Sequence, residues 1–366
     1  MSSKAGGARV ALVTGASGIT GRHCVHACLK RNEEWRVITL ARRDLQLGGE
    51  GATDQVQQVK ADLLDKGAVE AALRQAGAES VTHVFHCAYL MKKAPKEECE
   101  VNLSMLKNVV EAAEAAGAHL QHVFCMEGGK WYGQHLSTPL KTPHREDDPP
   151  IMPPMFYFDL QALYLEQRVE QGAPWTWSAL RPNPVCGFST GSFMNLSTSL
   201  AMYASICKEM GLPLRFPGTV DAWDSLVDVT DADLLAEGML HCATTPACAN
   251  QAFNICNGDC FRWKDMWPRF AEFFEMGTAP PVHTPLQVMA DKGEVWAALV
   301  KKHGLQDTPY NQLATWQFVD FVFTYPASWF STVNKLRRTG FHAMCIDSDA
   351  MFASLFQRLR EEKVIP

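Results

Sequence analysis

The chain has 366 residues, which is long enough for two domains or for one large α/β domain with an elaborated end. Hydrophobic residues make up 47% and charged residues 20%, which is typical of packed globular proteins and excludes disordered and collagen-like chains. The net charge of −6 leaves no basic surplus for a nucleic-acid backbone, so nucleic acid is excluded as a partner. No apolar run reaches about 18 residues and the first residues lack a signal-peptide pattern, so we expect a cytoplasmic protein without a membrane partner.

Twelve cysteines are present, and we expect them to be reduced because no secretory signal accompanies them. The closest pairs are Cys24 with Cys28 and Cys256 with Cys260, each separated by three residues. Neither pair has a second pair or a histidine cluster at the spacing of a zinc site. The sequence therefore predicts no metal site.

Strands and helices alternate through the first half of the chain. Short apolar runs predict strands at 10–13, 35–41, 55–60, 81–87, 121–126 and 175–180. A helix is expected directly after the first strand, and further helical patterns lie at 66–76, 101–116 and 157–171. This alternation indicates a Rossmann-like, doubly wound parallel α/β sheet.

The second half of the chain has a different pattern. A segment rich in Gly, Pro, His and Asp, 128–154, predicts a long loop at the active site. Helical patterns rich in Trp, Phe and Met at 191–210 and 261–366 indicate a mainly helical cap over an apolar ligand. We therefore expect a cofactor domain at 8–190, completed by 225–256, and a substrate-binding cap formed by 191–224 and 257–366.

Three glycines, Gly15, Gly18 and Gly21, lie between the first strand and the first helix. In a dinucleotide-binding turn, the first glycine allows the tight turn, the second lets the backbone approach the pyrophosphate, and the third permits close helix packing. The amide groups of the helix N-terminus then bind the phosphates. A purely structural turn is the alternative.

The end of the second strand distinguishes between cofactors. A carboxylate there binds the ribose of NAD, whereas arginine pairs with the 2′-phosphate of NADP. This chain has Arg42 and Arg43, which favour NADP(H) over NAD(H), with a solvated basic pair as the alternative. Asp62, after the third strand, is placed to bind the adenine amino group, with helix capping as its alternative role.

The glycine spacing resembles that of the extended short-chain dehydrogenase/reductases, whose catalytic signature is Tyr followed four positions later by Lys. Here Gln161 follows Tyr157 at that distance, and Glu127 and Gly128 stand where the catalytic serine is expected. The chain instead resembles the progesterone 5β-reductase and iridoid synthase-like enone reductases, whose motifs are Gly-x-Lys-His-Tyr and Asn-Phe-Tyr-Tyr. The matching segments are Gly128-Gly129-Lys130-Trp131-Tyr132 and Met155-Phe156-Tyr157-Phe158, and further matches include Arg181-Pro182-Asn183, Met194-Asn195 and the terminal Val364-Ile365-Pro366.

This resemblance implies an NADPH-dependent reductase that adds hydride to the β-carbon of enones or enals. Tyr157 would then stabilise the enolate oxygen and Lys130 would assist it. The cofactor contacts implied in addition to the glycines, Arg42, Arg43 and Asp62 come from Thr14, Ser17, Ile19, Leu63, Ala88, Lys130, Tyr157, Pro182, Asn183 and Val185. The implied substrate pocket comprises Tyr89, Phe156, Phe188, Phe193, Met194, Trp316 and Phe318.

Three other functions stay open at this point: a carbonyl reductase using the same two residues, a nucleotide-sugar epimerase or dehydratase, and a non-catalytic NADP(H)-binding sensor. The missing Tyr-x-x-x-Lys and Ser argue against the epimerase, and the presence of both Lys130 and Tyr157 argues against the sensor. We expect a small apolar enone or enal as substrate and a monomer or homodimer. The sequence alone leaves the natural substrate and the face of hydride delivery open.

Overall fold

The computed structural model describes residues 8–43, 45, 55–136, 140–151, 157–189 and 194–366. The chain forms two compact units, which we describe separately. The first comprises Met1–Trp131, Pro150–Arg181 and Leu235–Phe253, and the second comprises Tyr132–Pro149, Pro182–Leu234 and Asn254–Pro366. The segments 132–149, 182–190, 225–234 and 254–256, which the sequence pattern grouped with the cofactor domain, belong to the second unit. The functional division into cofactor domain and substrate cap stays a prediction.

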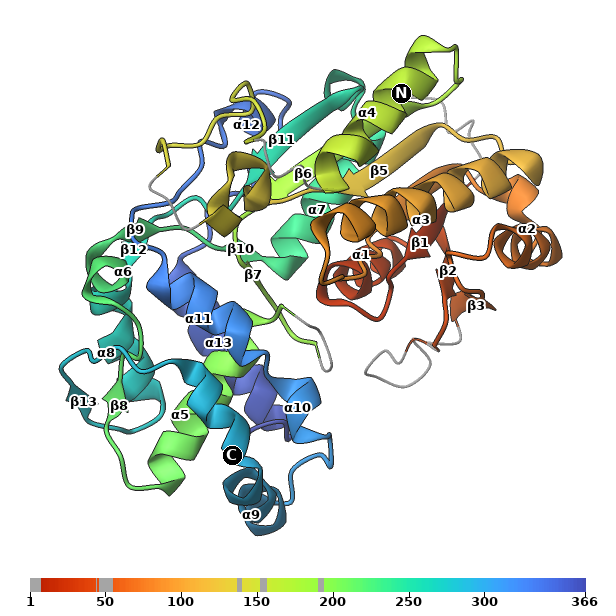
Figure 1. Ribbon diagram of the computed structural model, residues 1–366. Helices are drawn as coiled ribbons and strands as arrows, with labels where there is room; N and C mark the ends of the chain where they lie inside the picture. Colours follow the sequence, from red (N-terminus) through yellow and green to blue (C-terminus); the bar gives the residue numbers. More distant parts are fainter. Residues whose placement is uncertain (1–7, 44, 46–54, 137–139, 152–156, 190–193) are drawn as a thin grey trace. The chain divides into compact units, whose positions relative to one another are not determined.

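A seven-stranded sheet organises the first unit, in the order β11-β6-β5-β4-β1-β2-β3 (Figure 1). The strands are β1 (Arg9–Thr14), β2 (Trp35–Ala41), β3 (Val56–Lys60), β4 (His83–His86), β5 (His122–Met126), β6 (Thr176–Pro182) and β11 (Gln251–Ile255). The pairs from β6 through β3 are parallel. The strand order reverses between β1 and β4, and ligands of such sheets bind beyond the carboxyl ends of the strands at this point.

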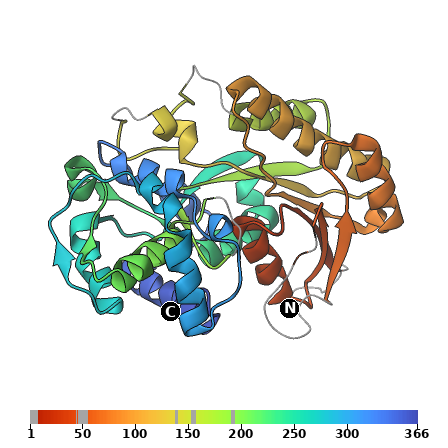
Figure 2. The same ribbon diagram turned by 60° about the horizontal axis from the view of Figure 1, so that its bottom comes forward.

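Helices cover both faces of this sheet, as Figures 1 and 2 show. The helices α2 (Lys66–Gln75), α3 (Pro95–Ala115) and α4 (Tyr157–Glu170) contribute Leu73, Leu106 and Leu165 to the same buried cluster as Val10 and Leu12 of β1. Side chains alternate along a strand, so the intervening Ala11 and Val13 face the opposite side. There lie α1 (Ile19–Leu29) and α7 (Ala232–Thr244), and Arg31, two residues after the end of α1, forms an ion pair with Glu237 of α7. The sheet is therefore buried on both faces, as a doubly wound fold requires.

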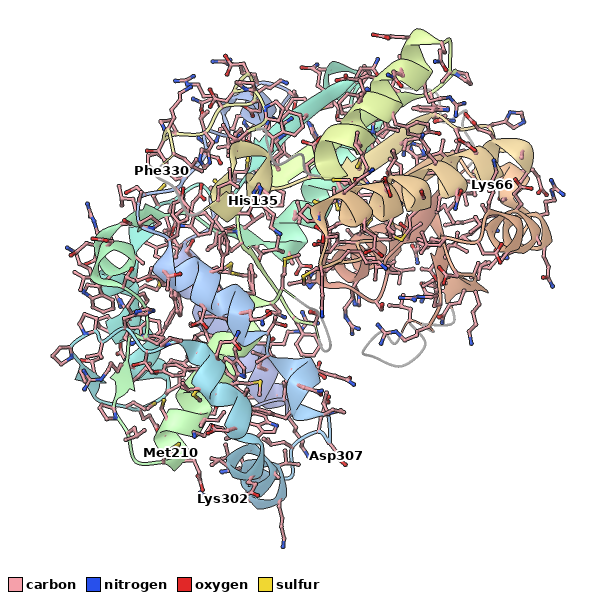
Figure 3. The ribbon with its side chains drawn as sticks, in the orientation of Figure 1. Lys66, His135, Met210, Lys302, Asp307 and Phe330 are labelled. Carbon is pink, nitrogen blue, oxygen red and sulfur yellow. The ribbon has the colours of Figure 1, made fainter. Side chains whose placement is uncertain are left out.

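The second unit is built around a separate aromatic core. Its helices are α5 (Leu196–Glu209), α6 (Val220–Asp224), α8 (Trp263–Phe273), α9 (Gly293–His303), α10 (Tyr310–Leu313), α11 (Trp316–Thr324), α12 (Asn334–Arg337) and α13 (Ser348–Glu361). Phe216, Trp263, Trp267 and Phe323 pack edge to face at the centre of this core. At its periphery Lys302 of α9 forms an ion pair with Glu209 of α5, near Met210 (Figure 3).

Short strand pairs complete the second unit. They are β7 (Val185–Cys186) with β10 (Thr230–Asp231), β9 (Leu226–Val227) with β12 (Phe261–Arg262), and β8 (Leu214–Arg215) with β13 (Thr278–Ala279). The doubly wound sheet and the largely helical C-terminal part thus confirm the predicted fold class. None of the helices among the described residues is long and apolar enough to span a membrane.

Candidate functional site

The glycine turn after β1 is closed by its own backbone. Gly18 N–H donates to Gly15 O at 2.9 Å, and Gly15 adopts a φ of +64°, which favours glycine. A Cβ at Gly15 would lie 2.6 Å from the carbonyl oxygen of Cys87, which follows β4, and one at Gly21 would lie 2.4 Å from Gly15 O. These glycines are therefore required by close backbone approach, and they bring the turn against Cys87 and Ala88.

The N-terminus of α1 is suited to an anion. Gly18 is the N-cap of this helix. Among the described residues, no side chain forms a capping hydrogen bond there, and the first turn of the helix contains no acidic residue. The amide groups of this turn thus have the positive end of a helix dipole without a competing carboxylate. Thr14, the last residue of β1 before the turn, is fully buried, and its Oγ1 lies 3.1 Å from Nδ1 of His86.

The polar residues expected at the adenosine end of the site follow β2 and β3. Arg42 and Arg43 are exposed directly after β2. The N-cap of α2 is Asp65, whose Oδ1 accepts from Ala68 N–H at 2.9 Å, so Asp62 does not have the helix-capping role. Asp62 instead accepts from Leu64 N–H at 3.1 Å.

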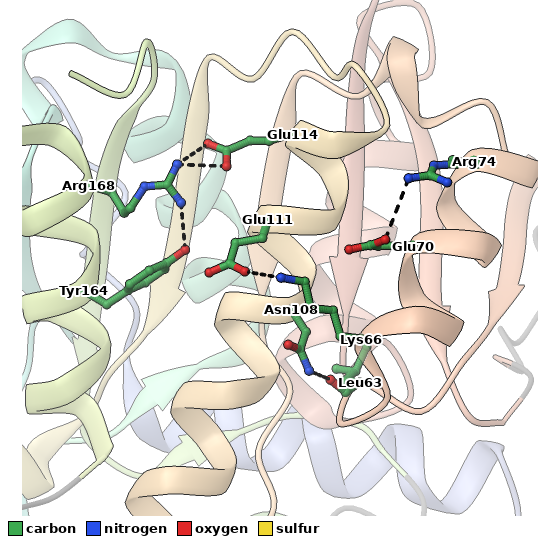
Figure 4. Close-up of polar contacts among 9 residues, drawn as sticks. All are labelled: Leu63, Lys66, Glu70, Arg74, Asn108, Glu111, Glu114, Tyr164 and Arg168. Carbon is green, nitrogen blue, oxygen red and sulfur yellow. Dashed lines mark hydrogen bonds and ion pairs between the residues drawn. The ribbon is translucent and has the colours of Figure 1, made fainter. Parts of the chain in front are cut away.

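Two side-chain hydrogen bonds connect the segment after β3 to α3. Asn108 donates to the carbonyl of Leu63 at 2.8 Å, and Lys66 bonds to Glu111 at 2.7 Å (Figure 4). Leu63 is buried, whereas Asp62 is exposed. This part of the loop therefore has a fixed position and presents the Asp62 carboxylate to solvent.

A buried carboxylate that the sequence analysis did not single out lies beside the predicted site. Glu98, in the first turn of α3, accepts from the hydroxyl of Tyr89 at 3.0 Å and from Lys92 N–H at 2.8 Å. Burial is the main reason why the pKa of Tyr89 is raised, and Glu98 raises it further, so Tyr89 stays a neutral phenol. Acidic residues after Pro95 are a helix-start signal, but nothing in the local pattern indicates that Glu98 is buried.

Lys130 lies in the 3₁₀ turn η3 (Gly129–Tyr132) after β5. It is half-buried, and burial lowers its pKa while the negative charge of Glu98 acts in the opposite direction. The next residue, Trp131, packs with Tyr89 and Leu160 against Cys99 of α3. These contacts bring together the segment after β4, the turn that carries Lys130 and the first turn of α4.

Tyr157 is the first residue of α4, and its side chain lies outside the described residues, as does all of Phe156. Gln161, one turn later, is buried, and both the nitrogen and the oxygen of its side-chain amide form hydrogen bonds. Its amide donates to Asn102 O at 3.0 Å, and its oxygen accepts from the thiol of Cys125 at 3.3 Å. The position that holds lysine in the common signature is therefore a structural link between α4, α3 and β5.

The predicted cofactor residues Pro182, Asn183 and Val185 belong to the second unit. The side chain of Asn183 accepts from Gln134 Nε2 at 2.7 Å and donates to Asp228 and, at 3.3 Å, to Ser331 Oγ. Val185 lies in β7 and pairs with Thr230. Asn183 therefore anchors its own unit through its side chain.

The predicted pocket residues that belong to the second unit differ in burial. Phe188 is buried, with the Arg358 guanidinium 4.6 Å from its ring centroid, and Trp316 belongs to the aromatic core. Met194 and Phe318 are only partly buried. Asn195 fixes the loop of Phe188 by donating to Gly187 O at 3.1 Å, while Phe193 lies outside the described residues.

A buried ion pair was also missed by sequence reasoning. Glu127 follows β5 and Arg181 lies near the end of β6, and Arg181 Nε donates to Glu127 Oε2 at 2.5 Å. The two residues are 54 positions apart, so no local pattern links them. In the part of the chain that the structure covers, no cluster of His, Cys, Asp or Glu is arranged to hold a metal ion.

Comparison with known proteins shows the family of the chain. A family model described as a PRISE-like Rossmann-fold domain matches residues 11–366. The (S)-8-oxocitronellyl enol synthase of Nepeta cataria is 35% identical over 98% of this chain and 93% of its own length. The 3-oxo-Delta(4,5)-steroid 5-beta-reductase of Arabidopsis thaliana is 31% identical over the same shares. Among solved structures, the Bordetella bronchiseptica enzyme WbmG in complex with NAD has a TM-score of 0.66 at 15% identity, covering 99% of this chain and 97% of that one, which is a likeness of fold.

Proposed function

The chain belongs to the PRISE-like Rossmann-fold family, and from this premise we propose that it is an NADPH-dependent reductase of activated C=C bonds in enones or enals. The arrangement around Lys130 carries the proposal. In the usual short-chain signature the lysine comes from the helix of the tyrosine, but here that position is Gln161, which is committed to Asn102 and Cys125. In our proposal the amine of the site comes instead from Lys130, in the turn after β5.

The residues present fit a bound dinucleotide. The turn at Gly15–Gly21 has no space for side chains at its first and third glycines, and the N-terminus of α1 is free of competing acids within the described residues. Arg42 and Arg43 supply exposed guanidinium groups at the end of β2, which suit a 2′-phosphate. These features support NADP(H) as the cofactor, which supplies hydride at the substrate β-carbon when bound.

Addition of hydride at the β-carbon leaves negative charge on the carbonyl oxygen. In our proposal the Tyr157 hydroxyl donates a hydrogen bond to that oxygen and so stabilises the developing enolate. Lys130 favours the ionised form of the phenol through its positive charge and lowers the tyrosine pKa. Glu98 supports this role because its charge favours the protonated form of Lys130.

The substrate in this proposal is small and largely apolar. Its candidate contacts are the residues that the family resemblance implies: Tyr89, Phe156, Phe188, Phe193, Met194, Trp316 and Phe318. The hydroxyl of Tyr89 already donates to Glu98, so it offers a substrate mainly its aromatic face. The names of the relatives, an enol synthase and a steroid reductase, support oxygenated terpenoid or steroid-like carbonyl compounds as the substrate class.

The test follows consumption of NADPH with cyclohexenone, a citral-like enal and progesterone, with the matching saturated ketones as controls and with NADH in parallel. Product analysis locates the new hydrogen atoms. We expect saturated carbonyl products and a rate about 100-fold to 1000-fold lower in Tyr157→Phe, the usual loss when one oxyanion donor is removed. Lys130→Met is expected to reduce the rate as well.

Two results would contradict the proposal in different ways. Allylic alcohols as products would mean reduction of the carbonyl group instead of the C=C bond. Tight NADPH binding without turnover of any of these compounds would argue for a cofactor-binding protein without this activity. Leu163→Ala provides a control variant, because Leu163 is exposed on α4 and makes no contact assigned to the site.

A further inference from the structure

Two oppositely charged side chains are buried beside Lys130, and the mechanism above uses neither. Arg181 is 4% exposed and Glu127 is 3% exposed, and Arg181 Nε donates to Glu127 Oε2 at 2.5 Å. Removing both charges from water costs several kcal/mol per ion, and their attraction often only offsets this cost. A buried pair of this kind is therefore weak evidence for a stabilising role and calls for another explanation.

The same guanidinium also lies over an aromatic ring. The Cζ atom of Arg181 is 3.7 Å from the ring centroid of Trp131. Arginine stacks on tryptophan through its planar guanidinium, and tryptophan gives the strongest such contact among the aromatic residues. Trp131 stands where the motif Gly-x-Lys-His-Tyr has histidine, so this contact depends on a residue at which the chain departs from the motif.

These contacts hold both ends of one short turn. Glu127 immediately precedes Gly128, and Trp131 immediately follows Lys130. Trp131 N–H donates to Gly128 O at 3.0 Å, and Trp131 O accepts from Ile151 N–H at 3.1 Å. Two successive glycines give the backbone wide conformational freedom, so the position of Lys130 depends on how the ends of the turn are held.

We propose that Arg181, through Glu127 on one side and Trp131 on the other, positions the turn of Lys130 for catalysis. All of the residues lie in the first unit. The proposal deepens the function proposed above and rests on it only in taking Lys130 as a catalytic residue. Arg181, Glu127 and Trp131 are positioning residues and act through Lys130.

The first unit contains a matched control for this cluster. Arg168 of α4 bonds to both carboxylate oxygens of Glu114 at 2.9 Å and lies 5.9 Å from the ring centroid of Tyr164 (Figure 4). It therefore also combines an arginine, a glutamate and an aromatic ring, with the two charged side chains 26% and 28% exposed. Arg168→Met removes a comparable set of contacts without touching the turn of Lys130.

The experiment measures the chemical state of Lys130 directly. The protein is acetylated with trace acetic anhydride over a range of pH, and peptide mass spectrometry gives the pH midpoint for Lys130 and for the exposed Lys96. Trp131→Leu is the main variant because it removes the ring and leaves the ion pair, and Trp131→Phe is its conservative counterpart. The double variant Glu127→Gln with Arg181→Met removes both buried charges together and so leaves neither unpaired. Glu98, the acid that acts on Lys130 from α3, is unchanged in all of them.

If the proposal holds, the labelling midpoint of Lys130 rises toward that of Lys96 in Trp131→Leu and in the double variant. It stays at the wild-type value in Trp131→Phe and Arg168→Met. The turnover number for an enone falls about 10-fold to 100-fold in the same two affected variants, as expected for a misplaced catalytic group. An unchanged Lys130 midpoint in folded Trp131→Leu overturns the proposal.

Failure of the proposed function gives a different result. In that case NADPH does not protect Lys130 from acetylation and no enone is reduced, even in the wild type. The shift of the Lys130 midpoint between wild type and Trp131→Leu still reports whether the turn is held. If the double variant Glu127→Gln with Arg181→Met does not fold, the two Trp131 variants decide the question.

Discussion

The thiol of Cys125 donates a hydrogen bond at 3.3 Å to the side-chain oxygen of Gln161, a residue that lies one helical turn after Tyr157. Gln161→Lys would create the spacing Tyr-x-x-x-Lys, but it would place an ammonium group where Asn102 O and Cys125 surround a neutral amide. We expect a loss of about 1–3 kcal/mol in the free energy of unfolding, because buried groups lose their partners. Urea unfolding measures it, with Gln161→Met as the neutral control. Recovery of activity by Gln161→Lys in a Lys130→Met background would contradict this assignment.

The parts of the site that sequence analysis predicted depend on local signals. The glycine turn, β2 with the arginines that follow it, and the first residue of α4 all follow from spacing within about ten residues. The start of α3 was expected at 101 but lies at Pro95, where proline at the first helical position and Glu97 and Glu98 give start signals of another kind. The strand expected at 81–87 is shorter, from His83 to His86.

The parts that were missed depend on contacts between distant residues. Glu127 and Arg181 meet because neighbouring parallel strands end together, and nothing near either residue indicates its partner. Asn183 likewise meets Asp228 and Ser331 only through the fold of the second unit. Buried polar side chains of this kind are paired by topology, which periodicity within a single segment does not encode.

Cofactor preference is expected to depend on the end of β2. Arg42→Ala with Arg43→Ala should weaken NADPH binding about 10-fold to 100-fold, since hydrogen bonds to charged groups contribute about 1.5–3 kcal/mol, and should leave NADH binding nearly unchanged. Arg36→Ala is the matched control, because Arg36 is exposed at the opposite end of the same strand. Fluorescence titration with both cofactors measures the effect. An equal loss for NADPH and NADH would contradict the assignment of these arginines to a 2′-phosphate.

Gly15→Ala is expected to abolish cofactor binding and to destabilise the first unit. The residue combines a φ of +64° with a Cβ position 2.6 Å from Cys87 O. Gly117 offers the matched control, because it has a φ of +82° but no atom within 4 Å of its Cβ position. Gly117→Ala should therefore show only the backbone strain, about 1–3 kcal/mol, whereas Gly15→Ala should lose more. Thermal unfolding with and without NADPH compares the two variants. Equal losses of stability would mean that the close approach to Cys87 O does not destabilise Gly15→Ala.

The stability of the second unit is expected to depend on pH through Asp228. Burial raises the pKa of this fully buried carboxyl group to about 6, although Ser331 N–H and Asn183 donate to it. Folding therefore favours the protonated acid, so its stabilising effect is complete below the ordinary aspartate pKa of about 4 and is lost as the pH rises through about 6.

Asp228→Asn removes this dependence. Between pH 4 and pH 7 the unfolding free energy of the wild type should fall by about 2.4 kcal/mol relative to that of the variant, which is most of the effect of a shift of about two pKa units. Asp148→Asn gives a control of opposite sign, because the contacts of Asp148 with Lys141 and Arg145 lower its pKa, so that its contribution is lost as the pH falls. Urea unfolding across this pH range measures both differences. If the wild-type and Asp228→Asn curves stay parallel from pH 4 to pH 7, Asp228 does not change its charge there, and its bonds with Asn183 and Ser331 are those of a permanently ionised group.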